Sequence, residues 1–201
     1  MDHDLYDWSC MQDRKPVQWP GGAKMALWIS YSLEFFPLDQ PAKPFKAPGG
    51  MVTPYPDLRH YTTRDYGNRV GIQRIWKVLD KHDLKASAAV NSKVAERYPY
   101  LINKITERGD EIIGHGVDMG KVHYGGMDDA EEKALIKESL STLRKASGQP
   151  VTGWWSPGKS ESFNTGKHLT ANGVEYSCDW GNDEMPYQMN EDAGNIWAMP
   201  H

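Results

Sequence analysis

The chain has 201 residues, which is enough to bury a substantial core within one domain. It carries 27 acidic and 23 basic residues, a formal net charge of −4, and no basic block, so neither nucleic acid nor an anionic membrane is an expected partner. The first ten residues lack the basic start and apolar run of a signal peptide, and no apolar stretch reaches membrane-spanning length, which predicts a cytoplasmic protein.

The beginning of the chain shows no sustained periodicity. Residues 1–23 mix charged residues with tryptophan, proline and glycine, which predicts an arm on the surface. The catalytic domain is expected to span residues 24–201. It opens with a nearly continuous apolar run at 25–31, the pattern of a strand that is covered on both faces.

A long proline-rich segment follows at 35–66. Six prolines and the pair Gly49-Gly50 argue against a helix or a central strand. The segment also holds aromatic residues, so it predicts an ordered lid that starts directly after Glu34.

Strands and helices are then expected to alternate. The apolar spacing predicts helices at 67–82, 92–108 and 128–147 and a short one at 162–171, with a kink or a split at Pro99. Asp65 is placed to cap the first of these helices, and Asp128 or Asp129 the third. Further strands are expected at 85–90, 111–114, 151–155, 174–178 and 195–199. This alternation predicts an α/β fold with a parallel sheet, open or closed as a barrel.

Ligand sites of parallel α/β sheets gather at the carboxyl ends of the strands. The residues at these ends are Glu34, Asn91, His115, Trp155-Ser156, Asp179-Trp180 and His201. His115 stands between Gly114 and Gly116, which removes bulk around the imidazole and suits the approach of a ligand or of another backbone. This arrangement fits a metal ligand or a general acid/base, and it also fits a hydrogen-bonded core histidine.

Several short segments share their order and spacing with one known family. They are RDYGNRVG at 64–71, GHG at 114–116, GWWSPG at 153–158, NT at 164–165 and NDEMPY at 182–187. From about residue 24 onward the chain resembles the polysaccharide deacetylase family, and it looks most similar to the branch of metal-independent allantoinases and cyclic-imide hydrolases. The resemblance implies a distorted (β/α) barrel that hydrolyses C–N bonds in sugar acetamides, cyclic ureides or imides.

The chain departs from the typical members of this family at the metal site. Those members carry an Asp-Asp pair after the first strand and a His-x-x-x-His pair after the third, where this chain has Glu34 alone and Met119 four residues after His115. Zn²⁺ usually needs three protein ligands, so Asp118 or His123 would have to complete the set. No cofactor is therefore favoured, and a divalent metal such as Zn²⁺ stays an alternative.

The resemblance and the residue types together assign roles. Without a metal, a carboxylate or imidazole must activate water, so Glu34 and His115 are the expected catalytic residues. Burial beside Leu33 and Phe35 is expected to raise the pKa of Glu34, unless an arginine such as Arg64 or Arg69 pairs with it. The expected substrate-binding residues are Asp65, Trp155, Trp180 and Asp183, each with a plain structural role as the alternative.

The sequence thus predicts a hydrolase of non-peptide C–N bonds that acts on a small amide, cyclic ureide or imide. The alternatives are a ligand-binding or accessory protein on the same barrel and a metal-dependent N-deacetylase of sugars. The family usually supplies further strands after a segment like 196–200, so the barrel is expected to be open at its C-terminal edge. An exposed edge predicts a homo-oligomer or a complementing chain there.

Overall fold

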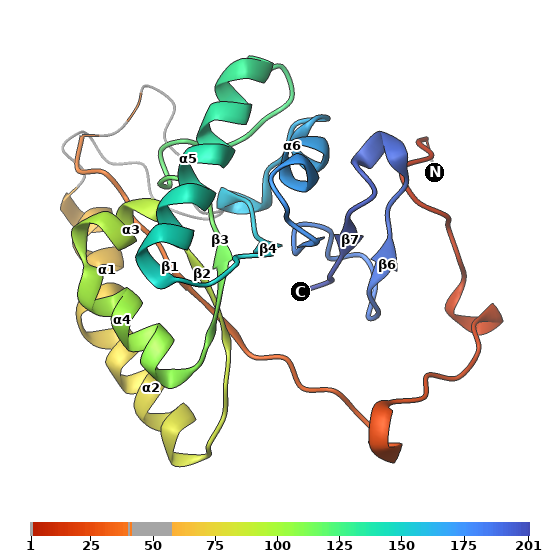
Figure 1. Cartoon of the computed structure of the whole chain (residues 1–201), viewed down its shortest axis with the longest axis horizontal. Coiled ribbons are helices and arrows are strands. Elements are labelled where there is room, and N and C mark those ends of the chain that lie inside the picture. Colours follow the sequence, from red (N-terminus) through yellow and green to blue (C-terminus); the bar gives the residue numbers. More distant parts are fainter. Residues whose placement is uncertain (1, 40, 42–57) are drawn as a thin grey trace.

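A seven-stranded sheet organises the computed structural model, which describes residues 2–39, 41 and 58–201 (Figure 1). The strand order is β1-β2-β3-β4-β5-β7-β6, and every neighbouring pair is parallel except the antiparallel pair β6–β7. The strands are β1 Ser30–Leu33, β2 Ser87–Val90, β3 Glu111–Gly114, β4 Gly153–Trp154, β5 Tyr176–Ser177, β6 Tyr187–Gln188 and β7 Trp197–Ala198. Within the described residues β1 and β6 are the two edges, so the predicted open α/β sheet is confirmed.

Helices separate the first five strands along the chain. They are α1 Leu58–Tyr66, α2 Ile72–Lys81, α3 Ser92–Arg97, α4 Pro99–Arg108, α5 Asp129–Ser147 and α6 Thr165–Ala171. A π-helical turn, η3 Gly67–Gly71, joins α1 to α2, and shorter 3₁₀ turns are η1 Met11–Asp13, η2 Pro20–Gly22, η4 Pro157–Lys159 and η5 Glu191–Ala193. None of the helices in the described part of the chain has the length and apolar character that a membrane span requires.

Local sequence signals account for several helix boundaries. The predicted break at Pro99 is confirmed, because α3 ends at Arg97 and α4 starts at the proline. Gly109 ends α4 in the left-handed conformation, with φ of 72°. Asp128 caps α5, since its side chain accepts a hydrogen bond from the backbone N–H of Glu131.

Two predictions about the proline-rich segment are wrong. Residues 58–66 form helix α1, and the helical chain continues through Gly67 into α2. Asp65 therefore lies inside a helix, where the N–H groups that a cap would bind are already paired along the helix. It forms an ion pair with Arg69 one turn later, at 3.7 Å. The part of the predicted lid at residues 40 and 42–57 lies outside the described residues.

The first strand is shorter than its apolar run predicts. β1 starts at Ser30, and Met25 and Leu27 are 77% and 73% exposed instead of buried. These residues precede the edge strand, and no strand within the described residues pairs with them. The two-residue strand β6 is too short to leave a periodic pattern in the sequence.

The N-terminal arm is tied to the far edge of the sheet. Tyr6 forms an isolated antiparallel bridge with Met189, and the guanidinium of Arg14 binds both carboxylate oxygens of Asp183 at 2.8 and 2.6 Å. From there the arm passes below the sheet to reach β1 (Figure 1). It therefore links the two edges of the open sheet. Association with a second chain at the C-terminal edge stays a prediction.

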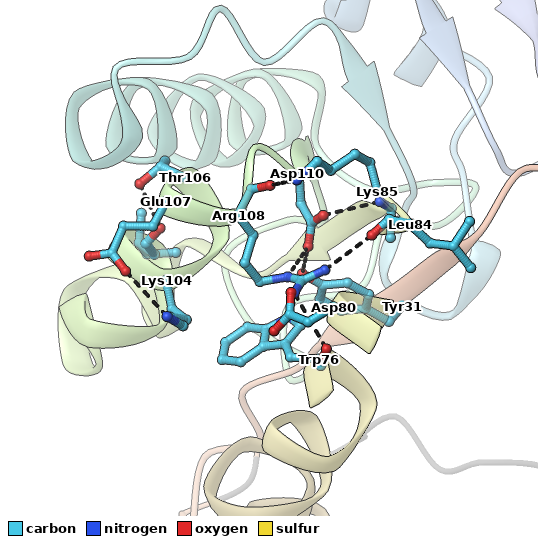
Figure 2. Close-up of polar contacts among 12 residues, drawn as sticks. Tyr31, Trp76, Asp80, Leu84, Lys85, Lys104, Thr106, Glu107, Arg108 and Asp110 are labelled. Atoms are coloured by element: carbon cyan, nitrogen blue, oxygen red, sulfur yellow. Dashed lines mark hydrogen bonds and ion pairs between the residues drawn. The ribbon is translucent and has the colours of Figure 1, made fainter. Parts of the chain in front are cut away.

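A buried polar network holds the amino ends of the first three strands together (Figure 2). Asp110 is 1% exposed, and its carboxylate accepts hydrogen bonds from Arg108 Nε at 2.9 Å, Tyr31 Oη at 2.9 Å and Ala86 N at 3.1 Å. Arg108 also binds Asp80, and Trp76 Nε1 donates to Tyr31 Oη at 2.9 Å. Each polar group that this network buries has a partner, which a buried charge requires.

Candidate functional site

The register of the sheet brings four predicted residues to one level. Leu33 pairs with Val90, Val90 with Gly114, and Gly114 with Trp154. The residues that follow these pairs are Glu34, Asn91, His115 and Trp155. The expectation that the carboxyl ends of the strands gather the polar residues is therefore confirmed for this half of the sheet.

Glu34 and His115 form the centre of this group. Glu34 Oε1 lies 3.6 Å from His115 Nε2, just beyond hydrogen-bonding distance, and Ser32 Oγ donates to the same carboxylate oxygen at 3.1 Å. The His115 side chain is 3% exposed and the Glu34 side chain 33% exposed. The imidazole is thus enclosed by protein, while the carboxylate reaches the surface of the site.

The tautomer of His115 follows from the hydrogen bond of its Nδ1 atom. Nδ1 lies 2.5 Å from the carbonyl oxygen of Trp155, which can only accept a hydrogen bond, so Nδ1 carries a proton. The lone pair of neutral His115 is therefore on Nε2, and it faces Glu34. Nε2 makes no hydrogen bond within the described residues, so this buried nitrogen is available to exchange a proton with a bound molecule beside Glu34.

The charge state of Glu34 differs from the sequence prediction. Burial does raise the pKa of this carboxyl, but His115, Ser32 and the Arg64 guanidinium together lower it more, so the pKa lies below its ordinary value. The apolar neighbours of Glu34 in the sequence indicated that its carboxyl would be buried, whereas the distance between Glu34 and His115 depends on the fold. Glu34 is therefore charged at neutral pH.

The glycines beside His115 are required by packing within this chain. A Cβ on Gly114 would lie 2.5 Å from the ring of Trp154, and a Cβ on Gly116 would lie 2.5 Å from Pro157. Gly116 also has φ of 68°, which favours glycine. The space that the sequence suggested for a ligand is filled by these two side chains, and they hold the loop after β4 against His115.

Two asparagines fix the backbone around the pair. Asn91 is fully buried; its Oδ1 accepts from Phe35 N at 2.7 Å and its Nδ2 donates to the carbonyl of His115. Asn68, in the π-helical turn, donates to the carbonyl of Glu34 at 2.7 Å. The sequence placed Asn91 at a strand end but gave no signal for either contact.

Glu34 borders a groove of about 250 Å³ between β1 and the helical segment 63–75. Arg64 and Asn68 line this groove and also line a smaller hollow that contains Asp65. Arg64 stacks over the ring of Phe36 at 4.1 Å. The structure therefore brings Asp65 near Glu34, although it does so from inside α1.

The other predicted substrate-binding residues fall into two groups. Trp155 contacts His115, with ring centroids 5.6 Å apart, and belongs to the site. His201 also contacts Trp155, with ring centroids 4.3 Å apart. Trp180 packs edge-on against Tyr6 of the arm and lines a separate cavity of about 570 Å³, and Asp183 holds Arg14 beside a third cavity. Their roles toward a substrate stay predictions.

The donor set does not fit a three-ligand metal site. Asp118 Oδ1 accepts from Gly120 N at 2.8 Å, and His123 Nδ1 pairs with Glu132 at 3.1 Å in a network that includes Ser162 and Thr165. Within residues 2–39, 41 and 58–201, no three His, Cys, Asp or Glu side chains are grouped so that they could hold an ion. Glu34 and His115 lack the third protein ligand that Zn²⁺ usually needs.

The sequence did not indicate that two carboxyl groups, those of Glu161 and Asp179, lie close together. Glu161 accepts from Trp180 Nε1 at 3.0 Å, and Asp179 accepts from Ser156 N at 2.8 Å and from Ser177 Oγ at 2.9 Å. Burial and the neighbouring Asp179 raise the pKa of Glu161 to about 9. The pair anchors the loop after β4, whose Trp155 carbonyl orients His115.

Comparison with known proteins defines the class of this chain. The model of the family described as polysaccharide deacetylase matches residues 54–177. Because this match covers more than half of the chain, the chain belongs to the polysaccharide deacetylase family. Among curated proteins it is 25% identical over 194 residues to a Schizosaccharomyces pombe protein named "Putative polysaccharide deacetylase", a match that covers 86% of this chain and 59% of the relative. This chain therefore spans less than two thirds of that relative.

Solved structures share the fold. PuuE allantoinase superposes with a TM-score of 0.77 at 24% identity, over all of this chain and 68% of that one. A structure titled "probable Polysaccharide deacetylase from Pseudomonas aeruginosa PAO1" gives a TM-score of 0.79 at 22% identity, over all of this chain and 69% of that one. These likenesses confirm the predicted barrel type.

Proposed function

We propose that this chain is a hydrolase of non-peptide C–N bonds that acts on a small amide, cyclic ureide or imide. The observation that carries the proposal is the Glu34–His115 pair, in which a carboxylate and the lone-pair nitrogen of a buried imidazole lie 3.6 Å apart. Membership of the polysaccharide deacetylase family supports hydrolysis as the reaction class. The fold shared with an allantoinase supports the inclusion of cyclic ureides.

Glu34 and His115 would divide the proton transfers between them. When Nε2 of His115 carries a proton, the charged Glu34 orients a water molecule and takes one of its protons as the oxygen attacks the carbonyl carbon. The tetrahedral intermediate then loses its C–N bond, and the nitrogen receives the proton of His115 Nε2. The proton on Glu34 returns to His115 when the products leave, which restores the pair.

The low pKa of Glu34 defines its part in this scheme. A carboxyl that stays charged at neutral pH can orient the water molecule and accept its proton during the attack, and its charge stabilises an imidazolium at His115. The carbonyl of Trp155 keeps the imidazole in the tautomer that presents Nε2.

A turnover screen with matched variants tests this proposal. The purified protein is assayed against allantoin, hydantoins, succinimide and N-acetylated sugars, beside Glu34→Gln and the surface control Glu96→Gln. We expect hydrolysis of a member of one class, a loss of about 10²–10⁴-fold in kcat for Glu34→Gln, and no change for the control. Full activity of Glu34→Gln would refute the assignment, and binding without turnover would favour the accessory-protein alternative.

A further inference from the structure

Asn91 connects the two strand ends that carry the candidate catalytic residues. Its side chain joins the backbone N–H of Phe35, directly after Glu34, to the backbone carbonyl of His115. Asn91 lies on β2's carboxyl end, between these strands, and is 0% exposed. Its own N–H donates to the carbonyl of Leu33 at 3.1 Å, so the residue is itself fixed to β1.

The two contacts require an amide and fix its orientation. A backbone N–H can only donate and a carbonyl oxygen can only accept, so Asn91 must present its oxygen to Phe35 and its nitrogen to His115. A carboxylate at this position satisfies the first contact and places an oxygen against the carbonyl of His115. An apolar side chain satisfies neither contact and leaves two buried backbone groups unpaired.

We propose that Asn91 is a positioning residue that holds Glu34 and His115 at the separation needed for proton transfer. This inference rests on the proposed function and adds to it a residue that touches neither the substrate nor the reacting atoms. Proton transfer depends steeply on the distance between the groups, and a displacement of about 1 Å can lower a rate about 10²-fold. Loss of either contact frees one strand end relative to the other.

Two variants of Asn91 and one neighbouring control separate positioning from general packing. Asn91→Asp keeps the volume and the contact with Phe35 but removes the donor to His115, and Asn91→Ala removes both contacts. Ser92→Ala is the control, because Ser92 is adjacent and fully buried, and its hydroxyl makes no hydrogen bond within the described residues. Circular dichroism establishes which variants fold.

The readouts are the steady-state constants and the crystallographic distance between Glu34 and His115. In folded Asn91→Asp and Asn91→Ala, we expect kcat to fall about 10–100-fold with KM changed less than about twofold, and the distance to exceed 3.6 Å. Ser92→Ala is expected to keep the wild-type steady-state constants and the wild-type distance between Glu34 and His115. A folded Asn91→Asp with unchanged kcat and distance would overturn the proposal, as would failure of both Asn91 variants to fold.

The two proposals can fail separately. If the wild-type protein turns over none of the tested compounds, the proposed function fails and the crystallographic distance still decides whether Asn91 positions the pair. If the wild-type protein is active but Asn91→Asp changes KM instead of kcat, the proposed function stands and the role of Asn91 is refuted.

Discussion

The two ends of the parallel sheet differ in how completely their buried polar groups are hydrogen-bonded. At the amino ends, the carboxylate of Asp110 receives three hydrogen bonds, and the guanidinium of Arg108 binds Asp110, Asp80 and two backbone carbonyls (Figure 2). At the carboxyl ends, Nε2 of the buried His115 makes no hydrogen bond within the described residues and faces Glu34 at 3.6 Å. The buried polar groups of the first arrangement all have hydrogen-bond partners. In the second arrangement, Nε2 of His115 lacks the partner that a proton or a bound ligand would supply.

This difference separates a structural role from a functional one. A satisfied buried network rigidifies the fold, and removal of one member costs stability. An incompletely satisfied pair contributes less to stability but can exchange a proton with a bound molecule. Barrel enzymes commonly divide their two faces in this way, with stability at the amino ends of the strands and chemistry at the carboxyl ends.

The largest expected effect comes from Asp110→Ala. The change removes the buried carboxylate that pairs with Arg108 and leaves the N–H of Ala86 unpaired, so the free energy of unfolding should fall by about 3–5 kcal/mol. Urea unfolding followed by circular dichroism measures this loss. An unfolding free energy within about 1 kcal/mol of the wild-type value would show that the amino-end network is not the structural anchor.

The variant His115→Gln tests the carboxyl end of the sheet. Glutamine is polar and of similar length but cannot transfer a proton near neutral pH, so kcat should fall about 10²–10³-fold while unfolding changes little. Parallel kinetic and unfolding measurements on this variant and on Asp110→Ala would show opposite patterns. A large loss of stability in His115→Gln with normal turnover would reverse the comparison.

Glu161 provides a pH-dependent test beside the carboxyl end of β5, where it contacts Ser177 and Trp180. Its pKa is raised from 4.5 to about 9 in the folded chain, so the stability associated with this group is complete below about pH 4.5 and is lost as the pH rises toward 9. The charged and titratable groups near Glu161 are Asp179 and Tyr187, with Asp2 and His3 lining the adjacent cavity. We expect Glu161→Gln to flatten the decline of unfolding free energy between pH 5 and 9.

Chemical denaturation of the wild-type protein and Glu161→Gln across this pH range measures the effect. The exposed residue Glu175 provides the control Glu175→Gln, which should keep the wild-type slope. Equal slopes for all three proteins would show that the folded chain does not raise the pKa of Glu161.

Tyr31→Phe is the mildest test of the amino-end network. The hydroxyl accepts from Trp76 and donates to Asp110, so its removal should lower the free energy of unfolding by about 1–2 kcal/mol without changing kcat. Tyr100→Phe, at a residue that is 63% exposed, is the matched control. A drop in kcat with unchanged stability would connect this network to the chemistry.

The sequence revealed those features that depend on neighbouring residues along the chain. Helix stops such as Gly109, the cap Asp128 and the break at Pro99 are local, and the strand ends at Glu34 and His115 followed from apolar runs. Helix α1 was missed because prolines precede it and its own residues are mostly polar. The pairing of Arg14 with Asp183 joins residues that are 169 positions apart, which no local pattern reveals.

The sequence indicated that Glu34, Asn91, His115 and Trp155 lie at the same end of the sheet, but it did not indicate the electrostatics there. Burial alone indicated a raised pKa for Glu34, whereas the folded chain lowers the pKa through His115, Ser32 and Arg64. The metal alternatives Asp118 and His123 were plausible by spacing, yet the fold gives each of them another partner. The contacts of the Asn91 amide depend on the fold, which brings the ends of β1, β2 and β3 side by side.

The most direct test of the central claim is one variant with two readouts, kcat and the free energy of unfolding of Glu34→Gln. An incompletely satisfied, partly exposed carboxylate that serves chemistry predicts a fall of about 10²–10⁴-fold in kcat, with unfolding changed by less than about 1 kcal/mol. A variant that loses several kcal/mol of stability and keeps its turnover would contradict the account, because Glu34 would then act like Asp110.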